Sequence, residues 1–229
     1  MRNALTLLMI AAGLVVLAFL YPSLRGLLLW SGGSFATVAA AYALQKPCVF
    51  GKRSDGTMAP LPSLLLLPYL LLTWLLWYGQ TRLSREAAWD EVAPGLWLGR
   101  RISAERMPRG VTLIVDLTSE FSEPRSVREG RHYLCLPALD NAAPERGAFQ
   151  DAVRQVSGWE GGVYVHCALG HGRSALVVAA VMMARGLAAT PVEALALLHR
   201  ARPGVSLSWE QRAFLERPPL VARRLAPPS

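Results

Sequence analysis

Three long apolar stretches dominate the first third of the chain. They cover residues 4–20, 27–44 and 61–78. At a rise of about 1.5 Å per residue, each is long enough to cross most of a bilayer. Trp74, Trp77 and Tyr78 close the third stretch, as aromatic side chains do at a membrane surface, and Pro68 predicts a kink within it. The pattern predicts a membrane region over residues 1–80 with about three transmembrane helices.

Two other interpretations of these stretches stay open. The first stretch has the length of a signal peptide, but the sequence that follows Leu20 is Tyr-Pro-Ser, which lacks the small residues of a cleavage site and favours an uncleaved anchor. The second could be one arm of a re-entrant hairpin, because the connection over 21–26 is short. Its small residues Gly32, Ala36 and Ala40 recur every fourth position, which allows close helix–helix association within or between chains.

The rest of the chain alternates short apolar runs with helical patterns. The predicted strands are 95–99, 111–117, 132–136 and 162–166. The predicted helices are 103–107, 144–156, 173–184, 191–200 and 209–216. This alternation indicates an α/β fold with a central, mainly parallel sheet flanked by helices. We expect a polar, helical linker over 81–90, a globular domain over 91–217 and a disordered tail over 218–229.

Charge and cysteine content exclude several classes of protein. The formal net charge is +8, and 22 of the 24 basic residues are arginines. No basic run is interleaved with aromatic residues, so nucleic acid is not an expected partner. Cys48, Cys135 and Cys167 are too few for a disulfide framework and lack the spacing of a metal site. The expected partners are therefore the lipid bilayer and a substrate.

The most informative stretch is Val-Tyr-Val-His-Cys-Ala-Leu-Gly-His-Gly-Arg-Ser, which ends at Ser174. A buried strand delivers Cys167, a five-residue loop follows, and Arg173 opens a helix. The amide groups of such a loop and the helix N-terminus together form an anion site, which favours the thiolate form of the cysteine. Gly170 and Gly172 permit the tight turn, and the arginine fork can hold two oxygens of a phosphate group. A thiolate below a bound phosphate is placed for attack on phosphorus.

This Cys-x5-Arg-Ser pattern resembles the signature of the cysteine-dependent protein-tyrosine-phosphatase superfamily. Residues 90–217 resemble its small dual-specificity branch, and the segment 91–99 looks like the opening strand of that branch. The chain is most similar to bacterial membrane-linked dual-specificity phosphatases and, more distantly, to the mitochondrial phosphatidylglycerophosphate phosphatase. The resemblance implies a dual-specificity-phosphatase fold and a cysteinyl-phosphate intermediate, with no metal and no cofactor.

The same resemblance assigns roles to individual residues. Cys167 is the nucleophile, and Asp140 is the general acid and then the base. Ser174 hydrogen-bonds the thiolate, and His166 orients the loop. The phosphate-binding loop comprises Ala168, Leu169, Gly170, His171, Gly172 and Arg173.

Several nearby residues have alternative interpretations. Asp116 is a second candidate for the acid, but its place at the end of a buried strand favours a local pairing. Gln211 could position water, although Ser208-Trp-Glu-Gln also reads as a capping box, which we favour. Cys135 could trap oxidised Cys167 as a disulfide, but it is more simply a buried strand residue. His171 either touches substrate or faces solvent.

Three functions fit the pattern. The first is a phosphatase for a membrane phospholipid such as phosphatidylglycerophosphate, because the anchor holds the site at the bilayer. The second is a tyrosine or dual-specificity phosphatase for membrane-associated phosphoproteins, and the third is a catalytically silent phosphate-binding scaffold. The loop interior has no Lys or Arg, which argues against polyphosphoinositides. A reactive thiol favours a reducing compartment, so we expect an integral protein of the inner or plasma membrane with its phosphatase domain in the cytoplasm.

Overall fold

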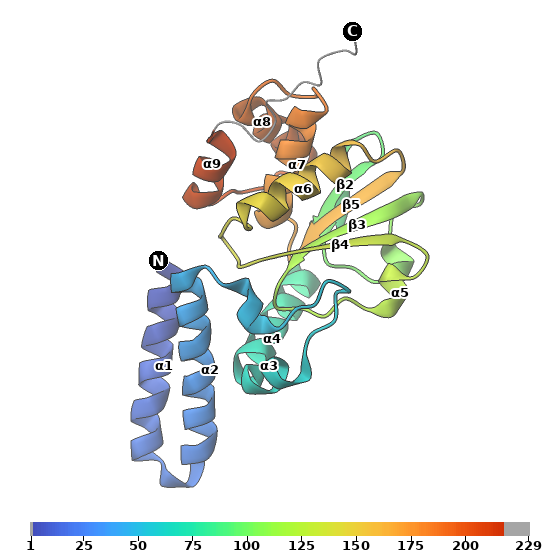
Figure 1. Cartoon of the computed structure of the whole chain (residues 1–229). Coiled ribbons are helices and arrows are strands. Elements are labelled where there is room, and N and C mark those ends of the chain that lie inside the picture. The colour runs from blue at the N-terminus through green and yellow to red at the C-terminus, as the bar shows by residue number, and fades with distance from the viewer. Residues whose placement is uncertain (1, 218–229) are drawn as a thin grey trace. The chain divides into compact units, whose positions relative to one another are not determined.

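The structure is a computed structural model that describes residues 2–217, so the tail predicted over 218–229 lies outside the described residues. The chain forms two compact units (Figure 1). The first contains the residues up to Glu86 together with the distant segment Thr118–Arg125. The second contains Ala87–Leu117 and the residues from Ser126 onward.

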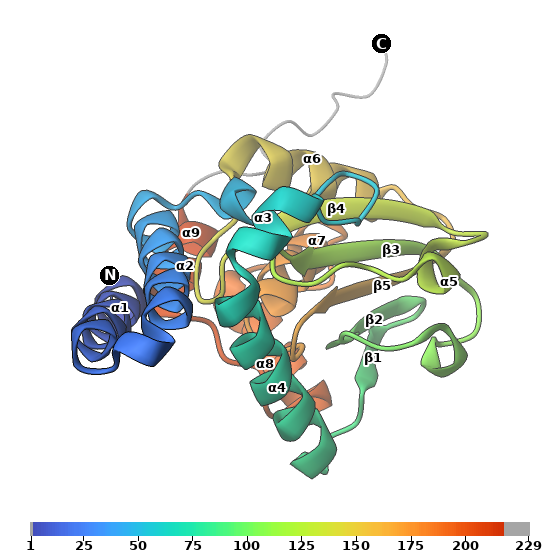
Figure 2. The same cartoon turned by 90° about the horizontal axis from the view of Figure 1, so that it is seen from below.

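The N-terminal unit begins with a helical hairpin. Helix α1 (Arg2–Leu20) and helix α2 (Arg25–Leu44) lie side by side and are joined by the short 3-10 turn η1 (Pro22–Leu24) (Figures 1 and 2). A Cβ atom on Gly32 would lie 3.3 Å from the carbonyl oxygen of Ala11, so the glycine lets the two backbones approach closely. Gly32, the first residue of the small-residue stripe, therefore serves helix pairing within the chain, whereas Ala40 is exposed.

The third predicted span is not one continuous helix. Helix α3 (Pro60–Leu65) ends at Leu66, and helix α4 (Leu67–Leu83) starts directly after it. Pro68 explains the break, because it lacks an N–H group for the carbonyl four residues earlier and its ring clashes with that carbonyl. Within residues 2–217, only α1 and the segment Pro22–Leu44 are long and apolar enough to cross a membrane. Thus the structure has two candidate spans where the sequence predicts about three.

The second unit is built on a five-stranded sheet. Its strands are β1 (Trp89–Ala93), β2 (Leu96–Arg100), β3 (Val111–Thr118), β4 (His132–Ala138) and β5 (Gly162–Cys167), in the order β1-β2-β5-β3-β4 (Figure 2). Strands β2 and β3 both run parallel to β5, whereas β1 pairs antiparallel with β2. The four predicted strands are confirmed with shifts of one or two residues. Only Trp89 and Asp90, the first two residues of β1, fall in the linker predicted over 81–90, and the helical part of that linker ends with α4 at Leu83.

Alternating side chains of the central strands divide between two cores. Leu113 and Val165 point into the larger core, on the face covered by α6 (Arg146–Ser157), α7 (Arg173–Ala184), α8 (Pro191–Ala201) and α9 (Trp209–Glu216). Ile114 and Tyr164 point into a smaller core on the opposite face. That second face is covered by short elements, η3 (Ala104–Arg106) and α5 (Arg125–Arg128), so the helix predicted over 103–107 is a single 3-10 turn.

Candidate active site

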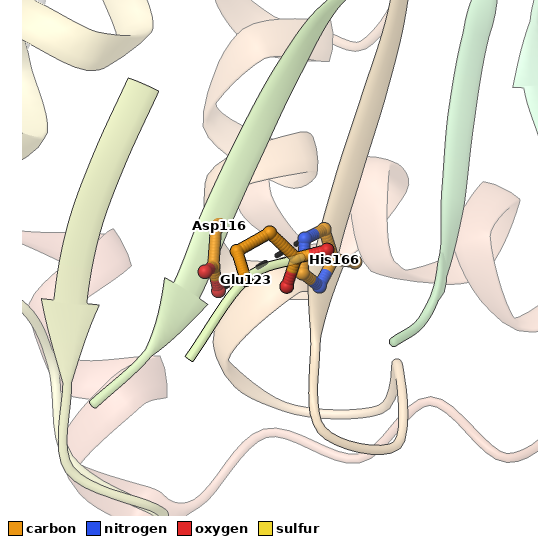
Figure 3. Close-up of side chains that lie close together, drawn as sticks. All are labelled: Asp116, Glu123 and His166. Atoms are coloured by element: carbon orange, nitrogen blue, oxygen red, sulfur yellow. Dashed lines mark ion pairs between the residues drawn. The ribbon is translucent and has the colours of Figure 1, made fainter. Parts of the chain in front are cut away.

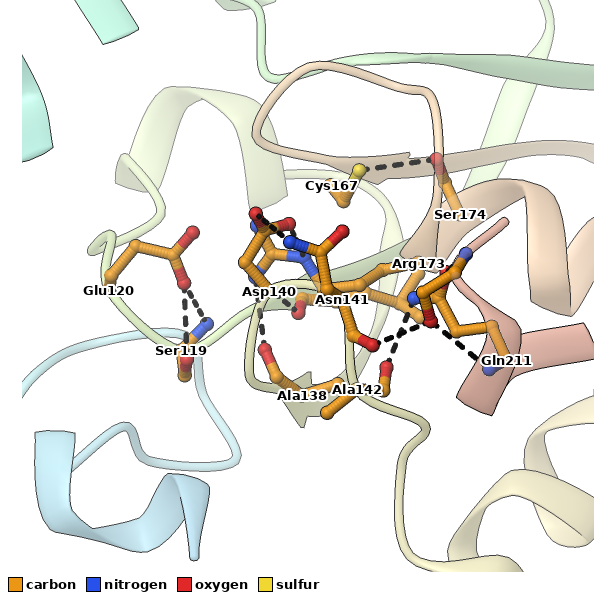
Figure 4. Close-up of polar contacts among 12 residues, drawn as sticks. Ser119, Glu120, Ala138, Asp140, Asn141, Ala142, Cys167, Arg173, Ser174 and Gln211 are labelled. Atoms are coloured by element: carbon orange, nitrogen blue, oxygen red, sulfur yellow. Dashed lines mark hydrogen bonds and ion pairs between the residues drawn. The ribbon is translucent and has the colours of Figure 1, made fainter. Parts of the chain in front are cut away.

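The loop predicted to bind phosphate connects the centre of the sheet to the most buried helix. Strand β5 ends at Cys167, the loop spans 168–172, and α7 begins at Arg173 (Figure 4). In the strand register Cys167 pairs with Arg100 of β2, and the preceding His166 pairs with Asp116 of β3. Cys167 therefore lies at the carboxyl end of a strand flanked by two parallel neighbours, the edge at which α/β proteins place their ligand sites.

The backbone of the loop requires glycine at one position. Gly170 has a φ of +79°, and a Cβ atom there would lie 2.6 Å from the carbonyl oxygen of Gly99. Both the left-handed conformation and the lack of space exclude other residues. Of the other loop residues, Ala168, Leu169, His171 and Gly172 are half-buried. His171 is thus partly exposed to solvent.

Two polar groups point at the sulfur of Cys167. The Oγ atom of Ser174 lies 3.3 Å from Sγ, and the N–H group of Gly170 donates to Sγ, also over 3.3 Å (Figure 4). The structure thus places Ser174 where the sequence analysis expected it, beside the thiol.

Arg173 is held by backbone carbonyls on the two strands beyond β5. Its side chain is 1% exposed, and Nη1 donates to the carbonyl oxygen of Ala138 over 2.9 Å and to that of Leu117 over 3.4 Å. Its Nε lies 3.5 Å from Oδ1 of Asp140. Because carbonyls at the ends of β3 and β4 anchor the guanidinium, its position depends on both strands.

Asp140 follows β4 on an exposed turn. Its side chain is 61% exposed, and its carboxylate accepts a hydrogen bond from Nδ2 of Asn141 over 3.2 Å (Figure 4). Asn141 has a φ of +61°, a conformation that asparagine tolerates better than most residues. The sequence separates Asp140 and Arg173 by a helix and a strand, and the fold brings their side chains together.

Gln211 caps α9 and also holds this turn. Its Oε1 accepts from the N–H group of Ser208 over 2.9 Å, and its own N–H donates to Oγ of Ser208, which confirms the predicted capping box. In addition, Nε2 of Gln211 donates to the carbonyl oxygen of Ala142, and Oγ of Ser208 donates to that of Asn141 (Figure 4). The capping box therefore ties α9 to the turn that carries Asp140.

Asp116 on β3 and His166, which directly precedes Cys167 on β5, form a buried pair (Figure 3). Oδ1 of Asp116 lies 3.9 Å from Nε2 of His166, and its Oδ2 accepts a hydrogen bond of 2.6 Å from the hydroxyl of Tyr133. The ring of Tyr164 stacks on the ring of His166 at a centroid distance of 5.6 Å. Asp116 is thus enclosed and paired locally, as its position in the strand predicts, while Asp140 is the carboxylate beside Arg173.

Arg202 is a residue of this site that the sequence analysis did not identify. Its buried guanidinium donates from Nε to the carbonyl oxygen of Gly170 over 3.0 Å and from Nη2 to that of Leu169 over 3.2 Å. Nη1 pairs with Oδ2 of Asp90 at 2.7 Å. Arg202 thereby holds two carbonyl groups of the loop. The sequence signal for Arg202 is an Arg-Pro-Gly stretch that directly follows a predicted helix, and such stretches are too common to indicate a site residue.

The family comparison agrees with this geometry. The family model described as the dual specificity phosphatase catalytic domain matches residues 96–216, which is more than half of the chain. No curated protein sequence matches the chain.

Solved structures with a similar fold include three phosphatases. The G95A mutant of Tk-PTP is 26% identical with a TM-score of 0.50, and the match covers 56% of this chain and 91% of that one. PTPMT1 is 20% identical over 56% and 91% of the two chains, with a TM-score of 0.45. Human DUSP28 is 27% identical over 57% and 92%, with a TM-score of 0.43. With its Cys-x5-Arg-Ser loop at the end of the central strand, the chain belongs to the dual specificity phosphatase family and is a cysteine-dependent phosphatase.

Proposed function

We propose that the protein is a membrane-anchored phosphatase that hydrolyses the phosphate monoester of a membrane phospholipid such as phosphatidylglycerophosphate. The observation that carries this proposal is the apolar surface of the N-terminal hairpin. Only 11% of the apolar window of α1 is buried within the protein, and large side chains such as Leu8, Val16 and Phe19 are exposed along it. An exposed apolar surface of this extent is typical of a helix that contacts lipid.

In the first step, Cys167 attacks phosphorus. The Sγ–P bond forms as the bond from phosphorus to the ester oxygen breaks, and Asp140 gives its proton to the departing oxygen. Arg173 and the amides of the loop hold the three remaining phosphate oxygens, whose charge they neutralise. These groups supply the positive charge that phosphoryl transfer requires.

In the second step, water attacks the cysteinyl-phosphate. Asp140, now a carboxylate, takes a proton from the water as the new O–P bond forms and the Sγ–P bond breaks. Ser174 donates a hydrogen bond to the departing thiolate, which is consistent with its Oγ atom lying 3.3 Å from Sγ. His166 acts as a positioning residue, because its buried ring directly precedes Cys167.

The anchor favours a lipid substrate because it raises the effective concentration of that substrate at the site. A substrate confined to the same bilayer meets the site at a high effective concentration, which a soluble phosphopeptide does not. The loop between Cys167 and Arg173 carries no Lys or Arg, so its charge suits a single phosphate group. We place the phosphatase unit in the cytoplasm, where its thiol stays reduced.

Substrate choice can be tested with the full-length protein in detergent micelles. Phosphate release from phosphatidylglycerophosphate is compared with release from a phosphotyrosyl peptide at matched concentrations, with Cys167→Ser as the blank. We expect kcat/KM to favour the lipid by about a hundredfold, or about 2.7 kcal/mol in the transition state. A preference for the peptide would identify a phosphoprotein substrate, and a lack of Cys167-dependent release from both would support a scaffold.

The role of Asp140 predicts a leaving-group effect. Asp140→Asn removes the proton donor, so we expect kcat to fall about 100-fold for an alkyl phosphate, within the usual contribution of a general acid. For p-nitrophenyl phosphate the loss should be much smaller, because nitrophenolate departs without protonation. Asp151→Asn, on the exposed surface of α6, is the matched control. An equal loss with both substrates would count against Asp140 as the acid.

A further inference from the structure

The N-terminal unit contains a loop that belongs, by sequence, to the phosphatase domain. Residues 118–125 lie inside the region matched by the family model, between β3 and α5, but they pack with the first 86 residues. Thr118, Ser119, Glu120 and Phe121 are all buried. A loop of the catalytic domain is therefore held by the N-terminal unit.

Lys52 makes the central contact with this loop. Its Nζ atom donates to Oγ1 of Thr118 over 3.1 Å and also to the carbonyl oxygen of Phe121. The lysine is half-buried and stands at the start of a tight hairpin, where Lys52 bridges Met58. The carbonyl oxygen of Gly56, in the turn of the same hairpin, accepts from the N–H group of Glu123 over 2.8 Å. The hairpin 52–58 thus contacts both ends of the loop, at Thr118 and at Glu123.

Helix α4 adds a second contact. The indole Nε1 of Trp74 donates to the carbonyl oxygen of Glu120 over 2.9 Å, and the ring of Trp77 packs on that of Phe121 at a centroid distance of 5.4 Å. The carboxylate of Glu120 turns back to its neighbour, where Oε2 accepts from the N–H and Oγ of Ser119 (Figure 4). Both the main chain and the side chains of the loop are therefore fixed.

The loop is joined directly to an anchor of Arg173. Leu117, whose carbonyl oxygen accepts from Nη1 of Arg173 over 3.4 Å, is bonded to Thr118, which Lys52 holds. The strand register places the exit of β3 beside that of β5, because Asp116 pairs with His166. A displacement of Thr118 is therefore transmitted through one peptide bond to one of the two carbonyl groups that anchor the guanidinium.

We propose that Lys52 and Trp74, which hold the loop 118–125 inside the N-terminal unit, are positioning residues for the phosphatase reaction. They fix the loop 118–123, and through it the end of β3 and the guanidinium of Arg173. This inference needs only a phosphatase activity and goes beyond the proposed lipid substrate. A soluble aryl phosphate therefore tests it independently of the lipid question.

The test uses full-length protein in detergent with p-nitrophenyl phosphate. We expect Lys52→Met to lower kcat/KM about tenfold and to weaken inhibition by orthovanadate by a similar factor, because this five-coordinate mimic of the transition state needs Arg173 in place. Lys52→Arg, which keeps the positive donor, should restore most of both. Trp74→Phe should lower kcat/KM about threefold. A loss of folded protein alone would reduce the active fraction and leave the vanadate inhibition constant unchanged.

The chain contains matched controls for both substitutions. Lys46 is the only other lysine and is exposed, so Lys46→Met should leave kcat/KM unchanged. Trp30 donates its indole N–H to the carbonyl oxygen of Leu65 inside the same unit, so Trp30→Phe removes an equivalent hydrogen bond away from the loop. Either of two results would overturn the proposal. One is a kcat/KM for Lys52→Met that lies within twofold of that for Lys46→Met. The other is an inhibition constant for orthovanadate that is unchanged in both Lys52→Met and Trp74→Phe.

Discussion

Cys167→Ser is expected to lower kcat for every phosphate monoester by a factor on the order of 10^5, or about 7 kcal/mol. The hydroxyl of serine stays protonated at neutral pH, and two hydrogen bonds to Sγ do not provide a base that would remove its proton. The anion site itself should remain, because the loop amides and Arg173 are unchanged. Phosphate release by full-length protein with p-nitrophenyl phosphate measures the loss.

Cys135→Ser provides the control for this substitution. Cys135 is a half-buried thiol on β4 of the same unit, so its replacement removes a sulfur atom without touching the loop. Under reducing conditions we expect its activity to match that of the unmodified protein. Turnover by Cys167→Ser within tenfold of this control would exclude Cys167 as the nucleophile.

Arg173→Lys is expected to lower kcat/KM by about 10^3, or about 4 kcal/mol. Lysine keeps the positive charge but lacks the planar fork, so it cannot donate to the carbonyl oxygens of Ala138 and Leu117 and hold two phosphate oxygens at once. The affinity for inorganic phosphate should fall less than kcat/KM, because the fork matters most when charge spreads over the oxygens in the transition state. Both quantities can be measured with the same aryl phosphate assay.

The matched control for this prediction is Arg185→Lys at the other end of α7. Arg185 also donates from a partly buried guanidinium to backbone carbonyls, those of Val156 and Trp159. We expect both variants to lose a similar amount of thermal stability. Only Arg173→Lys should also lose a large part of its activity. Equal activities in the two variants would contradict the role of Arg173.

The geometry of the loop 168–172 was predictable because its signals are local. A strand of apolar residues, two glycines and a helix with a basic first residue follow one another over 12 positions, and backbone geometry then brings Cys167, Gly170 and Ser174 together. The capping box of α9 was predictable for the same reason. In these segments the contacts that define the motif join residues only a few positions apart.

Other features were missed because their cause lies far along the chain. The segment Trp89–Ala93 is a strand although two of its five residues are acidic, because β2 offers it hydrogen bonds across the sheet. Arg202 reaches the loop from the residue after α8, more than 30 positions away.

By itself, the sequence determined the class of this protein and the order of its parts: an apolar N-terminal region, an α/β phosphatase domain, and a loop with a cysteine before it and an arginine and a serine after it. These follow from short-range periodicity and from a motif whose members are held by adjacent backbone. Only the tertiary structure decided that Asp140, rather than Asp116, lies beside Arg173, that Arg202 holds the loop, and that Lys52 holds the segment after β3. Each of these is a contact between residues at least 30 positions apart, set by how strands and helices pack, and no local pattern encodes it.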